Sequence, residues 1–157
     1  GSRLYYLGRK YYVEMFQHPE VKNTMVAFNH SKFKITFNPK EQNQQESIRE
    51  AVDRFYYFQC REKILPMLEK WSDKTGLPFN QVRFRKLEKR WGSCSRQNNI
   101  LINTEAIKLP YSLIHYLLVH ELVHTKQRNH SKEFWAEVSK HLPNWKELDE
   151  RMVGMKM

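Results

Sequence analysis

The stretch HELVHTKQRNH, residues 120–130, holds three histidines and one glutamate. Residues four apart on an α-helix lie on the same face, so His120 and His124 present two imidazoles side by side. Both rings can then reach one metal ion at about 2.0–2.1 Å. Glu121 cannot easily join the same coordination sphere, but its carboxylate can reach a water beside the ion. The H-E-x-x-H pattern therefore predicts two metal ligands and one general base on a single helix.

The third histidine lies beyond the reach of a continuous helix, so the chain has to turn before His130. Residues 126–129, KQRN, supply the means, because Asn129 tolerates left-handed backbone and Ser131 can begin a new helix. We expect a helix that ends near Arg128 and returns His130 toward the other two. Three protein ligands leave a fourth position open, as in a catalytic zinc site.

Histidine also occurs on helices for purely structural reasons. We expect the helix to begin at Pro110 and to bury a core stripe beside His120 and His124. A single histidine there would most often be a hydrogen-bonded structural residue, but the pair with Glu121 favours a metal site. The stripe comprises Ile114, Leu118, Leu122 and Val123. The remaining histidines lack ligand spacing and are expected to be structural or exposed: His18, His30, His115 and His141.

The first half of the chain predicts strands followed by a long helix. Residues 4–38 read as strands, with a hairpin at the Gly-Arg-Lys turn, and Phe33, Ile35 and Phe37 alternate with polar residues. Residues 38–45, NPKEQNQQ, read as a polar linker. A capping box formed by Ser47 and Glu50 predicts a helix start. Pro66 should kink this helix, and Gly76 is a plausible end for it.

The second half predicts a sheet followed by helices. Residues 81–103 contain short strands, including a hairpin, and the run at residues 100–102 predicts a strand covered on both faces. Ser131 should cap the next helix, Pro143 should end it, and a short tail helix should follow. The expected fold is α+β, as one domain over residues 3–157 with a β-rich part at 3–40 and the zinc-site part at 41–157. Gly1 and Ser2 read as a tag remnant.

The length and composition of the chain limit the class of protein to which it can belong. A chain of 157 residues with 40% apolar residues fits one globular domain. No apolar run approaches the length of a membrane helix, and the start of the chain has no secretory pattern. Cys60 and Cys94 read as reduced thiols, so we expect a cytoplasmic protein. A formal charge of +10 invites a nucleic acid or another acidic partner, although a generally basic surface explains it too.

Four segments make the site resemble a known family. RWGSC, INTEAIKLP, IHYLLVHELVHTKQRNHSKEFW and LPNWK closely resemble the YgjP-like metallopeptidases, a zincin-like family, over roughly residues 80–150. The related SprT-like and Wss-type proteases share the H-E-x-x-H-x(5)-H pattern. Metzincins have the same histidine spacing with a glycine where this chain has Gln127, so the metzincin turn is not reproduced. The resemblance implies His120, His124 and His130 as ligands of one zinc ion per chain, and Glu121 as the catalytic acid and base.

The expected activity is a zinc-dependent metallopeptidase that cleaves a peptide or protein substrate. Zinc would activate a water, and Glu121 would take its proton and pass it to the leaving amine. Some relatives carry a nucleotide pyrophosphatase label. A metal-dependent nucleotide (pyro)phosphohydrolase and a nucleic-acid-associated hydrolase therefore stay as alternatives.

Residues 90–94 are candidates for substrate contacts. Arg90 could stabilise the oxyanion, because the resemblance places its segment near the site, although it could equally be a surface residue paired with Glu88. Gly92, Ser93 and Cys94 could form a strand edge that receives an extended substrate. Cys94 could be taken for a nucleophile, but no histidine is placed by sequence to activate it.

A cluster of basic residues precedes this segment. In an alternating strand, Arg83 and Arg85 share one face and could attract phosphate or an acidic protein segment, or they could simply be solvated. Only Glu88 opposes the cluster, which comprises Arg83, Arg85, Lys86, Lys89, Arg90 and Arg96.

Overall fold

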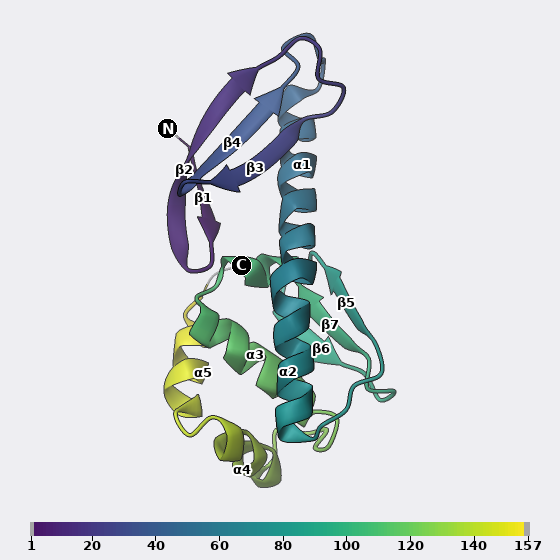
Figure 1. Ribbon diagram of the computed structural model, residues 1–157. Helices are drawn as coiled ribbons and strands as arrows, with labels where there is room; N and C mark the ends of the chain where they lie inside the picture. Colours follow the sequence, from purple (N-terminus) through teal and green to yellow (C-terminus); the bar gives the residue numbers. More distant parts are fainter. Residues whose placement is uncertain (1, 156–157) are drawn as a thin grey trace.

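The computed structural model describes residues 2–155. A four-stranded sheet lies at one end of a long helical rod, and a second sheet with the remaining helices lies at the other end (Figure 1). The strands are β1 (Arg3–Tyr6), β2 (Arg9–Gln17), β3 (Met25–Asn29), β4 (Lys32–Phe37), β5 (Val82–Arg85), β6 (Gly92–Cys94) and β7 (Ile100–Asn103). The helices are α1 (Gln44–Gln59), the π-helix η1 (Cys60–Ile64), α2 (Leu65–Thr75), the 3-10 helix η2 (Thr104–Lys108), α3 (Tyr111–Val123), α4 (Lys132–His141) and α5 (Trp145–Val153). This arrangement confirms the predicted α+β class.

The N-terminal sheet has the strand order β1-β2-β4-β3. β1 and β2 form the predicted hairpin, but its turn lies at Leu7 and Gly8, with φ angles of 50° and 88°, because Arg9 and Lys10 already pair in β2. The alternation predicted for β4 is confirmed, since Phe33, Ile35 and Phe37 are at most 9% exposed. Their face of the sheet packs against α1, where Phe33 and Phe55 stack edge to face at 5.5 Å.

The helical rod joins the two sheets. The predicted capping box is wrong, because α1 begins at Gln44 and Ser47 donates its hydroxyl hydrogen bond to Glu41 at 2.5 Å. The helix is interrupted near Pro66, as predicted. The π-helix η1 ends at Ile64, and Pro66 lies in the first turn of α2, which begins at Leu65. Gly76 ends α2 with φ 73°, as predicted.

The second sheet has the order β5-β7-β6, which leaves β6 at an edge. The predicted hairpin of β6 and β7 is confirmed. Ile100 and Ile102 are buried toward the helices, whereas Leu101 is only half-buried and lines a surface cavity. The prediction that β7 is covered on both faces is therefore wrong for the outer face.

α3 is the central helix of this half, and α2, α4 and α5 pack around it. Its apolar side chains are almost all buried, including Ile114, Leu118 and Leu122, each at 0% exposure. One hydrophobic cluster includes these residues together with Phe33 of the N-terminal sheet. The division into parts at 3–40 and 41–157 within a single domain stays a prediction. Within residues 2–155, no helix has the length and apolar character that a bilayer crossing requires.

Candidate active site

The three histidines of the quoted stretch converge on one point. One ring nitrogen from each of His120, His124 and His130 lies within 4.8 Å of the others, and the Nε2 atoms of His124 and His130 are 3.1 Å apart. Zinc–nitrogen bonds of 2.0–2.1 Å in a tetrahedron place two ligand nitrogens about 3.4 Å apart. The spacing thus suits one small metal ion, and it agrees with the sequence prediction.

Local structure explains how His130 reaches the other two. α3 ends at Val123, five residues before the predicted end near Arg128, and the chain turns through hydrogen bonds such as Gln127 N–H to Val123 O at 2.9 Å. Asn129 does not adopt a left-handed conformation, so the expected turn residue was wrong. Ser131 caps α4 as predicted, accepting from Phe134 N–H at 3.3 Å.

A buried aromatic ring holds the histidines from one side. Phe134 is 0% exposed, and its ring centroid lies 5.1, 4.6 and 4.9 Å from those of His120, His124 and His130. Because Phe134 belongs to the first turn of α4, the cap at Ser131 also positions this ring. The position of the third histidine therefore depends on where α4 begins.

The hydrogen bonding of His124 favours a metal-binding tautomer. Its Nδ1 lies 3.1 Å from the carbonyl oxygen of Gln127. A carbonyl can only accept, so Nδ1 carries the hydrogen and the lone pair of Nε2 points toward His130. Burial lowers the pKa of His124 and of His130, and the nearby His120 lowers both pKa values further. Neutral imidazoles of this kind fit zinc.

Glu121 is buried next to the histidines. Glu121 is 4% exposed, and its Oε2 lies 3.4 Å from Nδ1 of His120. On the other side, a Cβ atom at Gly92 would lie 3.2 Å from the same Oε2 and 2.9 Å from the carbonyl oxygen of Leu101. The edge strand β6 therefore approaches the carboxylate as closely as a glycine permits.

A cavity of about 270 Å³ opens beside Glu121. Arg90 and Gly92 line this cavity together with Glu121. Arg90 makes no ion pair with Glu88 in residues 2–155, and its role in substrate binding stays a prediction. The lining comprises Arg90, Trp91, Gly92, Tyr116, Leu117, His120, Glu121, Asp149 and Met152.

Two polar residues of this lining escaped the sequence reasoning. Tyr116 donates its hydroxyl hydrogen bond to Asp149 at 2.7 Å, which links α3 to α5. Burial, followed by this hydrogen bond, raises the pKa of Tyr116, so its hydroxyl stays a donor. Tyr116 could have been found, because it lies four residues before His120 on the same helical face. Asp149 carries no local signal, since only packing brings α5 to the site.

The residues after Gly92 have different surroundings. Ser93 lies on the opposite face of β6, where it lines another cavity. Cys94 is a free thiol whose pKa is raised chiefly by burial. Its Sγ lies 3.6 Å from the carbonyl oxygen of Ser95 and 3.9 Å from Nη1 of Arg128. A thiol that is hard to deprotonate makes a poor nucleophile, which argues against a cysteine mechanism.

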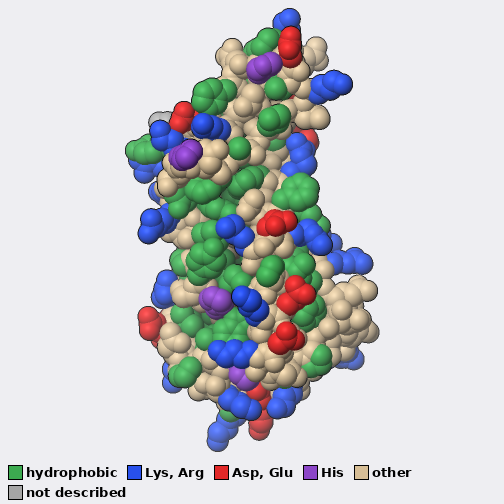
Figure 2. Space-filling model, viewed as in Figure 1, with side chains coloured by type: hydrophobic (Ala, Val, Ile, Leu, Met, Phe, Trp, Pro, Cys, Tyr) green, Lys and Arg blue, Asp and Glu red, His purple; other side chains and the backbone are tan. Residues whose placement is uncertain are grey.

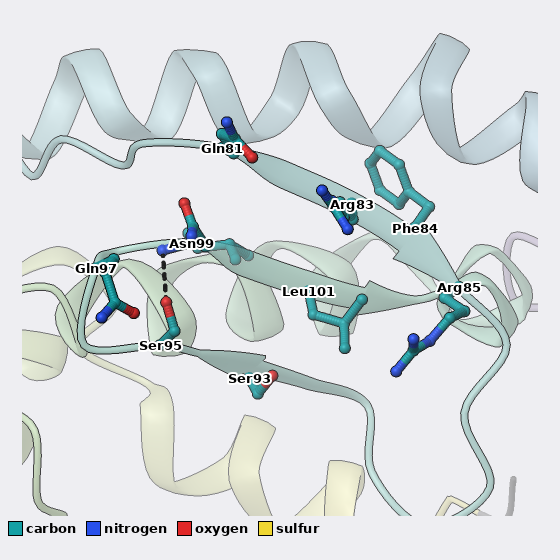
Figure 3. A pocket seen from close by; sticks show the side chains of 10 residues that line it. Gln81, Arg83, Phe84, Arg85, Ser93, Ser95, Gln97, Asn99 and Leu101 are labelled. Atoms are coloured by element: carbon teal, nitrogen blue, oxygen red, sulfur yellow. Dashed lines mark hydrogen bonds between the residues drawn. The ribbon is translucent and has the colours of Figure 1, made fainter.

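Arg83 and Arg85 share the outer face of β5, as their alternation predicted. They border a cavity of about 470 Å³ across the outer face of the second sheet (Figure 3). The other lining side chains are neutral: Gln81, Phe84, Ser93, Ser95, Gln97, Asn99, Ile100 and Leu101. The geometry suits an anion, and binding by this surface stays a prediction.

Comparisons with known proteins agree with this geometry. The family model "YgjP-like, metallopeptidase domain" matches residues 1–153. The metallopeptidase zymogen abylysin of Pyrococcus abyssi is similar in structure, with TM-score 0.53 and 30% identity, over 58% of this chain and 92% of that chain. The zymogen jannalysin of Methanocaldococcus jannaschii, at 17% identity, has a similar fold, with TM-score 0.52 over 59% of this chain and 95% of that chain.

A comparison with curated protein sequences gives no match. The family model nevertheless extends over both sheets and over the helices that carry the histidines. With three converging imidazoles and a buried glutamate in H-E-x-x-H spacing, the chain belongs to the YgjP-like metallopeptidase family.

Proposed function

We propose that this protein is a zinc-dependent peptidase in which His120, His124 and His130 bind one zinc ion. The convergence of three ring nitrogens within 4.8 Å, beside the buried Glu121, is the observation that carries the proposal. When bound, zinc would supply Lewis-acid chemistry, polarising the scissile carbonyl and a water. The two free thiols, Cys60 and Cys94, fit a reducing compartment, and we place the activity in the cytoplasm.

Glu121 is the proposed general base and acid. Its carboxylate lies next to His120 and lines the open cavity, so a water between them is within its reach. Glu121 takes a proton from this water and later delivers it to the leaving amine. The close approach of Gly92 limits the rotamers of the carboxylate, which keeps it aimed at the reacting atoms.

Arg90 and β6 are the proposed substrate contacts. Arg90 lines the same cavity as Glu121, and its guanidinium would stabilise negative charge on the carbonyl oxygen. β6 is an edge strand, so the backbone of Gly92, Ser93 and Cys94 can pair with an extended peptide. Strand pairing would lay the peptide along the cavity and bring one of its carbonyls to Glu121.

Peptide cleavage that depends on both zinc and Glu121 tests the proposal. A mixture of fluorogenic peptides should be cleaved by the zinc-loaded protein, lose cleavage with a chelator and regain it with zinc. Glu121→Gln keeps the shape and removes the base, so zinc should stay while the rate falls at least about 100-fold. The exposed Glu69 on α2 provides the matched control, and Glu69→Gln should cleave normally. An active Glu121→Gln protein would contradict the mechanism.

A nucleotide substrate is the second candidate. The carboxylate-free cavity beside Arg83 and Arg85 favours nucleotide binding, because phosphate oxygens suit paired guanidinium groups, although it lies on the face of the second sheet opposite Glu121. Incubation of the same zinc-loaded protein with nucleoside triphosphates, followed by a pyrophosphate assay, separates the two candidates. Pyrophosphate release without peptide cleavage would replace the peptidase proposal.

A further inference from the structure

We propose that the exposed face of the N-terminal sheet binds single-stranded nucleic acid, with bases stacked on its aromatic side chains and phosphates held by its cations. This surface, called the outer sheet face below, is formed chiefly by Arg3, Tyr5, Lys10, Tyr12, Phe16 and Lys34. It is independent of the zinc site and of the proposed peptidase activity.

Strand register places these side chains side by side. Tyr12 pairs with Arg3, and Lys10 pairs with Tyr5, across the β1–β2 ladder. Further along, Phe16 pairs with Thr36, which pairs in turn with Met25. Directly paired residues point to the same side of a sheet, and residues two apart share a face. One face of β1, β2 and β4 therefore carries this set, and Met25 of β3 lies on the same face.

The aromatic side chains of this face are exposed although the opposite face is packed. Tyr5, Tyr12 and Phe16 are 49%, 57% and 42% exposed, and Met25 is 58% exposed. On β4 the alternate residues, such as Phe33, are buried against α1, whereas Met15 on β2 is 48% exposed. Single exposed apolar residues are common, but a contiguous group on one flat surface marks a site of interaction.

Charge identifies the partner as a polyanion. Glu14 is the acidic residue on this face, and it pairs with Lys32 at 3.3 Å. Arg3, Lys10 and Lys34 have no carboxylate within ion-pair distance in the described part of the chain. Figure 2 shows basic and hydrophobic side chains next to one another over the N-terminal sheet. A second copy of the same face would bring cation against cation, which disfavours a homodimer.

Cation–ring contacts indicate a stacking surface. The guanidinium carbon of Arg3 lies 4.4 Å from the ring centroid of Tyr12, and Nζ of Lys10 lies 5.3 Å from that of Tyr5. Exposed rings and guanidinium planes both stack on unpaired bases, while the neighbouring cations contact phosphate. Tyr12 and Phe16 are four residues apart, which is about 13 Å along a strand and leaves room for separate bases. A duplex hides its base faces, so a single strand is the better match.

Binding of fluorescein-labelled (dT)12 to the zinc-loaded protein, followed by fluorescence anisotropy between 50 and 300 mM NaCl, tests the proposal. Affinity should fall steeply with salt because phosphate contacts release counterions. Tyr12→Ser with Phe16→Ser should weaken binding at least about 10-fold, as loss of stacked bases predicts. Lys10→Ser with Lys34→Ser should weaken binding and flatten the salt dependence. Tyr12→Phe keeps a stacking ring and should bind as wild type.

Controls separate this surface from general basicity. Arg83→Ser with Arg85→Ser removes two cations from a surface that has no exposed aromatic side chain, and affinity should change less than about 3-fold. Tyr12→Leu with Phe16→Leu keeps the apolar area but removes the aromatic rings, so its affinity for (dT)12 should be as weak as that of the serine variant. It tests the role of the rings even if the serine variant does not fold. Far-UV circular dichroism and urea unfolding midpoints like those of the wild type would show that these variants are folded.

Four results would overturn the proposal. They are undetectable (dT)12 binding at 50 mM NaCl, equal affinity for a matched duplex, full affinity in the leucine variant, and loss of binding only in the Arg83 and Arg85 variant. Dimerisation of the wild type that Tyr12→Ser abolishes would instead assign this face to a second copy of the chain.

Discussion

Gly92 of β6 and Glu121 of α3 approach each other so closely that a Cβ atom at Gly92 would lie 3.2 Å from Oε2 of Glu121. The same atom would lie 2.9 Å from the carbonyl oxygen of Leu101, a distance that real Cβ atoms essentially never show. A backbone oxygen cannot yield like a flexible side chain. This contact ties the geometry of the edge strand to that of the proposed general base.

Gly92→Ala should therefore impair catalysis more than zinc binding. The added methyl group pushes β6 away from β7 or displaces Glu121, so we expect peptide cleavage to fall at least about 10-fold. Strain in the packed sheet should also lower stability by about 1–3 kcal/mol. Measured kcat, zinc content and urea unfolding check this. The exposed Gly154→Ala is the control, since its Cβ would meet nothing closer than 3.5 Å. Wild-type activity in Gly92→Ala would contradict the proposed role of the contact.

His124→Ala and His130→Ala should each lose most of the zinc. Two remaining imidazoles hold zinc poorly, and purified wild type should contain about one zinc per chain. Metal analysis after dialysis measures the loss. Full zinc occupancy in either variant would show that the ligands have been assigned incorrectly.

His115→Ala is the matched control on the same helix. Its Nδ1 accepts a hydrogen bond from Nε1 of Trp71 at 2.8 Å, so it joins α3 to α2 and not to the metal site. The variant should keep its zinc and unfold at a lower urea concentration, because an indole N–H loses its acceptor.

Arg128→Ala should weaken zinc binding although Arg128 touches none of the histidines' ring nitrogens. Its guanidinium donates to the carbonyl oxygens of Ser95 and Arg96 at 2.6 and 3.1 Å and to Oδ1 of Asn98 at 2.5 Å. These bonds hold the loop before His130 against the turn between β6 and β7. We expect an affinity loss of about 10-fold, as for other supporting contacts around metal ligands.

Competition with a chromophoric chelator measures the zinc affinity of this variant. Arg128→Lys should not restore it, because one ammonium group cannot reproduce the planar fork. Arg96→Ala should bind zinc normally, because only the backbone oxygen of Arg96 takes part. Equal zinc affinity in wild type and Arg128→Ala would refute the role of this loop contact.

In the metal-free protein, stability should decline as the pH falls from 7 to 5. Burial lowers the pKa of His124 and of His130 below the ordinary value of 6.5, so the unfolded chain binds protons that the folded chain excludes. The stabilising contribution is fully present above the unfolded pKa and is lost as pH falls through the folded pKa. Urea midpoints at pH 7, 6 and 5 measure it. His124→Asn with His130→Asn should flatten this dependence, leaving a contribution from His115, whose pKa burial also lowers. An unchanged slope would contradict the prediction.

The sequence by itself determined the features that depend on local spacing. Four-residue spacing places His120 and His124 on one face of any helix, and period-two alternation buries Phe33 and Ile35 in any half-buried strand. The cap at Ser131 follows from the preference of serine for this position. These rules need only neighbouring residues, so they hold before the chain is packed.

Tertiary structure decided the features that depend on contacts between distant segments. The Ser47 capping box failed because the Ser47 hydroxyl bonds to Glu41 while α1 starts earlier, at Gln44. Asp149 comes to the cavity through the packing of α5 on α3, and Gly92 meets Glu121 through the packing of β6 on the same helix. A pattern in the linear sequence does not specify how far apart separate helices and strands lie. Such distances follow from which apolar faces the whole chain buries together, and they set the shape of the site around the histidines.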